Sequence, residues 1–197
     1  MTENIFSKRR EPFIFMLYLG IGGSILLFSG VFLIFFRNEI NSFDFKVIVP
    51  GAMWLSTLVI VLSSIAMYFS IKHIEKQDFT AFRQSLTFSY LLGYFFIFSQ
   101  IIGWYKLLYN SRLELNLNSS NAIMFVLSLL HVVHTGIGLI AFSLVLRKVF
   151  KNKRFEDSLV YSVNPPNVLN LSLMSKFWYF LAILWIIIFS FIVYHAI

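Results

Sequence analysis

Five long apolar runs dominate the hydrophobic and polar pattern of the chain. Each run is at least 20 residues long, enough for an α-helix to cross a hydrocarbon core of about 30 Å at about 1.5 Å per residue. A basic residue closes each of the first four runs, namely Arg37, Lys72, Lys106 and Arg147. The pattern predicts an all-α integral membrane protein, a bundle of five transmembrane helices over residues 13–36, 47–71, 86–105, 122–146 and 177–197.

Charged residues lie outside these runs or at their ends. Twelve of the 16 Lys and Arg residues fall on one side of the predicted bundle and four on the other. Because connections rich in Lys and Arg stay in the cytoplasm, this distribution predicts a cytoplasmic N-terminus and a C-terminus outside. No soluble segment interrupts the pattern, so we expect residues 1–197 to form a single membrane domain.

The longest connection, residues 147–176, is basic at its start and mildly apolar afterwards. It contains the sequence NPPN at 164–167, and consecutive prolines favour an extended or turning backbone. We therefore expect an extended or turning backbone at the prolines, and we expect the part SLVYSVNPPNVLNLSL (158–173) to lie along the membrane surface.

Composition agrees with a membrane protein. Hydrophobic residues make up 58% of the chain and charged residues 13%, against about 25% charged in ordinary soluble domains. The formal charge of +7 is explained by membrane topology, so we expect no nucleic-acid partner. Because the chain has no cysteine, disulfides, iron–sulfur clusters and thiolate metal sites are excluded.

Two histidines inside the fourth run are the main candidates for chemistry. His131 and His134 lie three residues apart in the sequence LSLLHVVHTGIGL, so they share one side of a helix. A zinc or iron site needs three or more ligands, and no carboxylate or further histidine is expected at this depth. One helix face also cannot supply both axial ligands of a haem. We therefore expect these imidazoles to bond across helices or to contact lipid, with Gln100, Ser99, Ser128, Thr135 and backbone carbonyls as partners.

Glycines and aromatic residues are also unevenly distributed. Four glycines and Ser24 lie in the first run, and Gly136 and Gly138 follow the histidines. Small residues let helices approach closely in lipid, so these positions favour a helix–helix contact over a constriction in an ion pathway. Several aromatic residues lie near predicted span ends, where an interfacial belt is expected: Trp54, Trp104, Trp178, Tyr179 and Tyr194.

Five motifs, in order, resemble subunit III of the haem-copper oxygen reductases, the cytochrome c and quinol oxidases. The sequence LLFSGVF (26–32) resembles the FFAGLF pattern of the first helix, and PGAMWLSTLVIVLSS (50–64) resembles the start of the second. FIFSQIIGWYKL (96–107) is similar to the Q-x-x-E-W stretch, and LLHVVHTGIGL (129–139) to H-G-L-H-V-x-x-G-L. KFWYFLAILWIIIFSFIVY (176–194) is similar to the closing YWHFVDVVWLFLFxxVY. The resemblance covers about residues 13–197 and matches the short, five-helix form of that subunit.

The chain departs from these motifs at their ionisable positions. Ser24 and Gly103 stand where the family patterns have acids, and Tyr179 and Ala182 stand where the closing pattern has a histidine and an aspartate. Val132 replaces a glycine beside the first histidine. A role of these motifs in feeding protons is therefore not expected of this chain, which is a divergent relative.

The resemblance implies a non-catalytic accessory subunit of a terminal oxidase in an aerobic respiratory chain, located in the bacterial inner membrane. Such a subunit packs against the catalytic subunit I and other oxidase subunits, holds phospholipids and carries no cofactor itself, since haem and copper belong to the catalytic subunit. We expect no catalytic or metal-binding residue here. The candidate lipid- or helix-contact residues are His131, His134, Gln100, Trp104, Trp178 and Tyr179.

Three alternatives remain open at this point. The chain could be an accessory subunit of a nitric oxide reductase-type enzyme, which uses the same kind of fold. It could be a small haem- or quinone-binding redox protein that uses His131 or His134. A small transporter ranks last, because the runs have no charged residue, no break and no inverted repeat.

Overall fold

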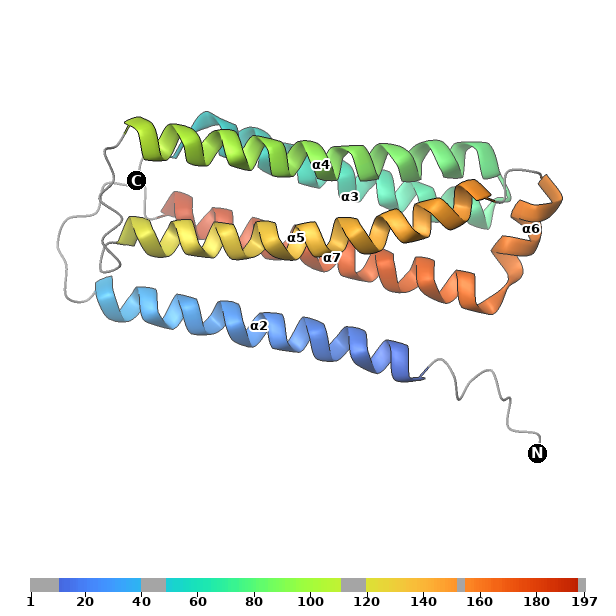
Figure 1. Ribbon diagram of the computed structural model, residues 1–197, viewed down its shortest axis with the longest axis horizontal. Coiled ribbons are helices and arrows are strands. Elements are labelled where there is room, and N and C mark those ends of the chain that lie inside the picture. The colour runs from blue at the N-terminus through green and yellow to red at the C-terminus, as the bar shows by residue number, and fades with distance from the viewer. Residues whose placement is uncertain (1–10, 40–48, 111–119, 152–154, 195–197) are drawn as a thin grey trace.

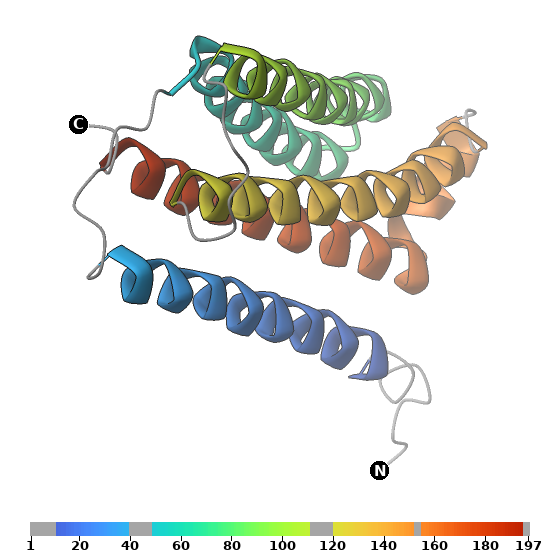
Figure 2. The ribbon, with the colours of Figure 1, turned by 60° about the vertical axis from the view of Figure 1, so that its left-hand side comes forward.

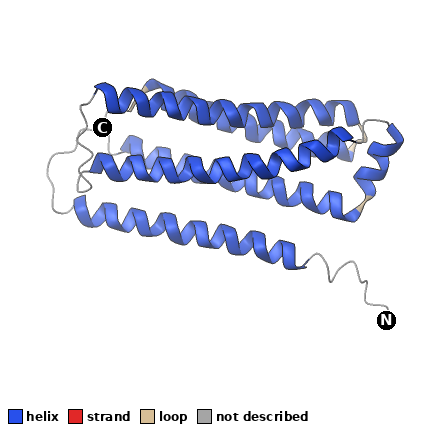
Figure 3. Ribbon diagram, in the orientation of Figure 1, coloured by secondary structure: helices blue, strands red, loops and turns tan. Residues whose placement is uncertain are grey.

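The computed structural model describes residues 11–39, 49–110, 120–151 and 155–194. Every regular element in these ranges is a helix (Figures 1 and 3). The helices are α2 (Glu11–Glu39), α3 (Gly51–Glu75), α4 (Phe79–Asn110), α5 (Ser120–Lys151), α6 (Phe155–Val163) and α7 (Pro165–Tyr194).

The five long helices run up and down, with α6 as a short cap at one end (Figure 1). Helices α3 and α4 form an antiparallel pair that packs on α5 and α7, and α2 lies on the opposite side of α5 and α7 (Figure 2). As a result, α2 begins and α7 ends at opposite ends of the bundle (Figure 1). An odd number of long helices that run up and down places the first and last ends of the bundle on opposite sides.

Among the described residues, five helices are long and apolar enough to cross a membrane, in agreement with the predicted all-helical membrane class. The candidate membrane-spanning segments are Pro12–Ile34, Gly51–Glu75, Phe79–Lys106, Phe125–Lys151 and Pro166–Tyr194. Which end faces the cytoplasm stays a prediction from the Lys and Arg distribution.

Helix α4 begins seven residues before the apolar run that predicted it. A tight turn joins it to α3, in which Gln77 adopts a left-handed conformation with φ of 59°. Asp78 then accepts a hydrogen bond at Oδ1 from the backbone N–H of Ala81 at 3.0 Å. This side-chain cap starts the helix at Phe79, within polar sequence that an apolar pattern does not mark.

The chain turns between α6 and α7 (Figure 1), but the residues on both sides of this turn are helical rather than extended. The position of this segment along the membrane surface stays a prediction. Residues 155–163 form α6, and the two prolines begin α7, which starts twelve residues earlier than predicted. The carbonyl of Asn164 accepts hydrogen bonds from the N–H groups of Asn167 and Val168. Proline suits the first turn of a helix, since its missing N–H would have no partner there.

The core lies between α3, α4, α5 and α7. Its largest fully buried side chains are Trp178 and Trp185 of α7, Phe96 of α4, Phe142 of α5 and Phe28, which α2 contributes. Close helix contact occurs at Gly93, where an added Cβ would lie 2.7 Å from Cη2 of Trp178. The glycine thus makes room for the indole ring.

The glycines of α2 do not form the expected close contact within this chain. No atom outside the local helix lies within 4 Å of a Cβ built at Gly20, Gly22, Gly23 or Gly30 among the described residues. At Gly138 of α5, an added Cβ would lie 2.9 Å from Cδ1 of Leu181 in α7, so this glycine does allow a close helix contact. The small-residue interpretation therefore holds for Gly138 and not for the first span.

Candidate functional site

His131 is fully buried near the centre of the bundle. Its ring centroid lies 5.2 Å from that of Trp185 and 5.7 Å from that of Phe96. Phe28 of α2 approaches from the other side at 6.5 Å. The imidazole is thus enclosed by aromatic rings from three other helices.

The hydrogen bonds of His131 stay within its own helix. Thr135 donates its hydroxyl hydrogen to the carbonyl of His131 at 3.0 Å. Because that hydrogen is used, the imidazole Nε2–H donates to Thr135 Oγ1, at 3.3 Å. The other ring nitrogen, Nδ1, is buried and has no partner among the described residues.

His134 lies one turn further along α5 and is half-buried. Its Nδ1 donates to the carbonyl of Leu130 at 2.8 Å, and its ring packs 5.5 Å from that of Phe28. In the described residues, the hydrogen bonds of both histidines therefore run along α5, and their expected contact with other helices or with lipid stays a prediction. Of the named partners, Thr135 and a backbone carbonyl are used.

Other polar residues do connect the helices at this level. Gln100 of α4 is fully buried and donates from Nε2 to Oγ of Ser56 in α3 at 2.6 Å. Trp104 donates from Nε1 to Oγ of Ser128 at 3.0 Å, which joins α4 to α5. Oε1 of Gln100 is another buried atom that has no partner in the described part of the chain.

Trp178 and Tyr179 lie side by side in the sequence but in different surroundings. Trp178 is fully buried in the middle of α7, so its assignment to an interfacial belt is wrong. Its Nε1 donates to Oγ of Ser63 at 3.0 Å. Ser63 also donates to the carbonyl of Ser89, and Ser89 to that of Ser63, at 2.8 Å each. Tyr179 is half-buried at the edge of the core.

Of the serines that make these contacts, Ser128 was among the expected partners, whereas Ser56, Ser63 and Ser89 were not. Ser56, Ser63 and Ser70 recur every seven residues along α3, and all three are fully buried. A seven-residue spacing keeps side chains on one face of a helix. That spacing inside an apolar run was a usable signal of a face packed against other helices.

The arrangement around the histidines does not suit metal binding. No three His, Cys, Asp or Glu side chains are grouped to hold a metal ion in the described part of the chain.

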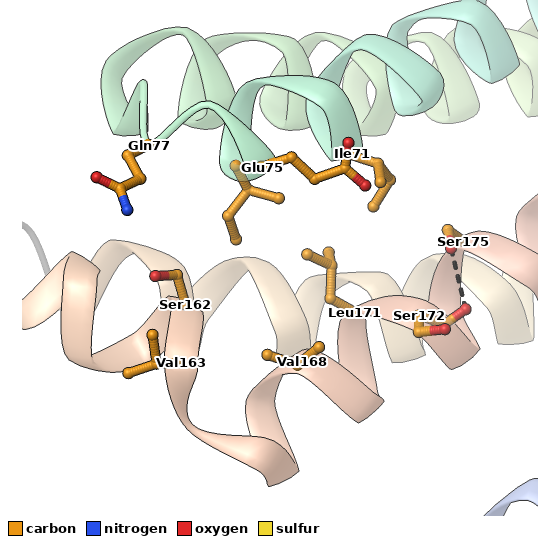
Figure 4. Close-up of a pocket in the computed structure, with 10 residues that line it drawn as sticks. Ile71, Glu75, Gln77, Ser162, Val163, Val168, Leu171, Ser172 and Ser175 are labelled. Atoms are coloured by element: carbon orange, nitrogen blue, oxygen red, sulfur yellow. Dashed lines mark hydrogen bonds between the residues drawn. The ribbon is translucent and has the colours of Figure 1, made fainter.

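A cavity of about 460 Å³ lies at the end of the bundle where α3 ends and α6 and α7 meet. Figure 4 shows its mostly apolar walls, which include Ile71, Val168 and Leu171. Glu75 and Gln77 contribute polar groups on the α3 side, opposite three serines of α6 and α7 (Figure 4). Its open, amphipathic shape suits a molecule with an apolar body and a polar head.

A second, smaller cavity of about 310 Å³ lies between α2, α5 and α7 at the same end. Its walls are apolar apart from Lys148 and Asn170. Both cavities therefore combine an apolar groove with polar groups near the ends of membrane-spanning helices.

The fold and these contacts define a multi-pass, all-helical membrane protein whose interior is built for packing. Over most of its length the chain is similar to proteins named as subunit 3 of cytochrome oxidases. It is 24% identical over 183 residues to the cytochrome bo(3) ubiquinol oxidase subunit 3 of Buchnera aphidicola, which covers 91% of this chain and 84% of the relative.

Two further relatives come from other bacteria. The cytochrome c oxidase subunit 3 of Corynebacterium diphtheriae is 22% identical, with 82% of this chain and 78% of the relative covered. The probable cytochrome c oxidase subunit 3 of Nocardia farcinica is also 22% identical, with 96% of this chain and 92% of the relative covered. No family model matches the chain. Five membrane-spanning helices and bacterial relatives of this kind are consistent with a multi-pass inner-membrane protein.

Proposed function

We propose that this chain is the non-catalytic accessory subunit III of a haem-copper terminal oxidase. It packs against and stabilises the catalytic subunit and holds lipids at its surface. The observation that carries the proposal is similarity to oxidase subunit 3 proteins over 82% to 96% of the chain. The buried side chains agree with it, because they make packing contacts between helices.

The first experiment is a purification of the tagged chain from native membranes in mild detergent. We expect a large subunit with haem and copper to co-purify, visible by mass spectrometry and in a reduced-minus-oxidised spectrum. A lone, colourless chain would overturn the proposal. A partner of the nitric oxide reductase type would establish the first alternative, and a lone chain with its own haem spectrum would establish the second.

Lipid binding is proposed at the cavity between α3, α6 and α7. Its apolar walls can take part of an acyl chain, while Glu75, Gln77 and the serines can bond to a headgroup. Val168 lines this cavity, whereas Val160 of α6 is exposed and does not line it. We expect Val168→Trp to fill the cavity and to reduce the lipid that co-purifies, measured by native mass spectrometry of the complex. Val160→Trp is the matched control. Equal lipid retention in the two variants would contradict this site.

A further inference from the structure

Helices α3 and α7 bring two lysines and two tyrosines together near the end of the bundle that α6 caps. Tyr68 and Lys72 lie one turn apart on α3, and the ammonium of Lys72 lies 4.6 Å from the centroid of the Tyr68 ring. Tyr68 is also close enough to Tyr179 of α7 to interact with it electrostatically. Lys176 precedes Tyr179 by three residues, so the two share one helix face. We call these four residues the lysine–tyrosine cluster.

The cluster lies on the same helix faces as the larger cavity. Glu75 of α3 lines that cavity and follows Tyr68 by seven residues, a spacing that keeps side chains on one face of a helix. Ser172 of α7 also lines the cavity and precedes Tyr179 by seven residues. Glu75 and Ser172 come from the two sides of the cavity (Figure 4). The groove between α3 and α7 therefore leads from the cavity to the cluster.

The cluster presents cations and hydrogen-bond donors that the chain itself does not use. Among the described residues, neither Lys72 nor Lys176 forms an ion pair with a carboxylate, and both side chains are exposed. The hydroxyls of Tyr68 and Tyr179 make no hydrogen bond to another described residue. Two ammonium groups and two hydroxyls thus converge on one groove, and an anion with several oxygens would match them.

The depth of the cluster determines which anion can reach it. Lys176 lies ten residues after the start of the segment Pro166–Tyr194, and Lys72 lies three residues before the end of Gly51–Glu75. At about 1.5 Å per residue, these positions are roughly 15 Å and 5 Å from the helix ends. Lysine stems extend towards the membrane surface, so both ammonium groups lie near the boundary between hydrocarbon and headgroups. The anions concentrated at that level are lipid phosphates.

We propose that this groove binds one anionic phospholipid, with the lipid phosphate held between Lys72 and Lys176. The inference rests on the proposed function and names the class of lipid that the cavity site holds. Tyr68 and Tyr179 donate to the phosphate oxygens, and the rest of the headgroup lies at the polar side of the cavity. The described residues of the groove include two lysines and one carboxylate, that of Glu75. Because its net charge is positive, the groove favours a lipid with a net negative charge over a zwitterionic one.

Native mass spectrometry of the purified oxidase complex tests the site with two added lipids, phosphatidylglycerol and phosphatidylcholine. The first has a net negative charge and the second has none. We expect the unmodified complex to bind phosphatidylglycerol more tightly. Equal affinity for the two lipids would overturn the preference for an anionic lipid.

The lysines are tested by the double variant Lys72→Gln, Lys176→Gln, which keeps both side chains long and polar and removes both charges. A lysine near the membrane surface is worth about fivefold in binding an anionic lipid. We therefore expect the double variant to bind phosphatidylglycerol roughly 25-fold more weakly. Loss of the partner subunit in this variant alone would overturn the inference, because the lysines would then contact a protein rather than a lipid.

Lys106→Gln is the matched control, because Lys106 is also exposed and ends a membrane-spanning segment, but at the opposite end of the bundle. We expect it to change phosphatidylglycerol binding less than twofold. Equal binding by the double variant and this control would overturn the site. Failure of any oxidase subunit to co-purify with the unmodified chain would instead overturn the proposed function, so the two failures are distinguishable.

Discussion

Helices α2 and α7 are similarly long and apolar, yet they are buried to very different extents. Within the chain 11% of the α2 span is buried, against 44% of the α7 span. Apolar side chains gain nothing from leaving lipid for a protein interior, so hydropathy does not decide which helix is central. Helix α7 instead carries two tryptophans that donate hydrogen bonds to α3, from Trp178 to Ser63 and from Trp185 to Thr57. Among the described residues, the hydroxyl of Ser24 in α2 donates to the backbone of its own helix, at Gly20.

The largest loss in the free energy of unfolding is expected when a central side chain of α7 is truncated. Trp178→Ala removes a fully buried indole and leaves Ser63 without its N–H donor. We expect a loss of about 3–5 kcal/mol in the free energy of unfolding, measured by denaturant titration in detergent.

Leu26→Ala on α2 is the control, because Leu26 is 76% exposed. It should change the free energy by less than about 0.5 kcal/mol. If Trp178→Ala prevents folding, Trp178→Phe should give a smaller, measurable loss. Similar losses for the Trp178 and Leu26 variants would refute the contrast between the two helices.

A single added methyl group should lower stability where it meets Trp178 of α7 but not where it lies on α2. In Gly93→Ala the new Cβ would lie 2.7 Å from the Trp178 ring and 2.9 Å from Leu139. We expect this overpacking to cost about 1–3 kcal/mol. Gly23→Ala has open space around the new Cβ. It should be neutral or stabilising by up to about 1 kcal/mol, because alanine favours the helix. Thermal unfolding of both variants in the same detergent checks the prediction, and a destabilised Gly23→Ala would contradict it.

Smaller effects are expected at buried hydroxyls. Ser56→Ala leaves the amide of Gln100 with no partner at either end. We expect a cost of about 1–2 kcal/mol. Gln100→Leu removes the amide N–H and the amide oxygen together, so it should cost less than Ser56→Ala. The double variant Ser56→Ala, Gln100→Leu should cost less than the sum of the two single variants. Ser24→Ala on α2 should change stability by under about 0.5 kcal/mol. Additive single effects, measured by a double-mutant cycle, would show that Ser56 and Gln100 do not act as a pair.

The five spans could be predicted because unbroken apolar runs of this length have few other structures available. The ends of the helices could not, since they depend on local contacts. The Asp78 cap begins α4 in polar sequence, and Pro165 begins α7 inside a segment that resembles a turn. Helix α6 is nine residues long and is too short for an apolar pattern to mark.

The candidate site was predicted in part. The depth of His131 follows from its place in the fourth run, but its partners depend on how α5 is rotated. Sequence gives little guidance on rotation, because the side chains are apolar around the whole helix. Thr135 is a partner of His131 because it lies four residues later, one turn along the same helix. Gln100 was also expected as a partner of the histidines, but it bonds to Ser56. The roles proposed for His131, His134, Gln100, Trp104, Trp178 and Tyr179 stay predictions.

The position of α2 has a consequence for the order of synthesis. Its main neighbours in the chain, α5 and α7, are translated long after it. Helices α3 and α4, joined by a short turn, can pair as soon as both are made. At about 5–20 residues per second, α2 waits several seconds before α5 is complete. A newly made α2 must therefore persist in the bilayer without the rest of its chain. Its apolar, outward-facing surface suits it to that interval.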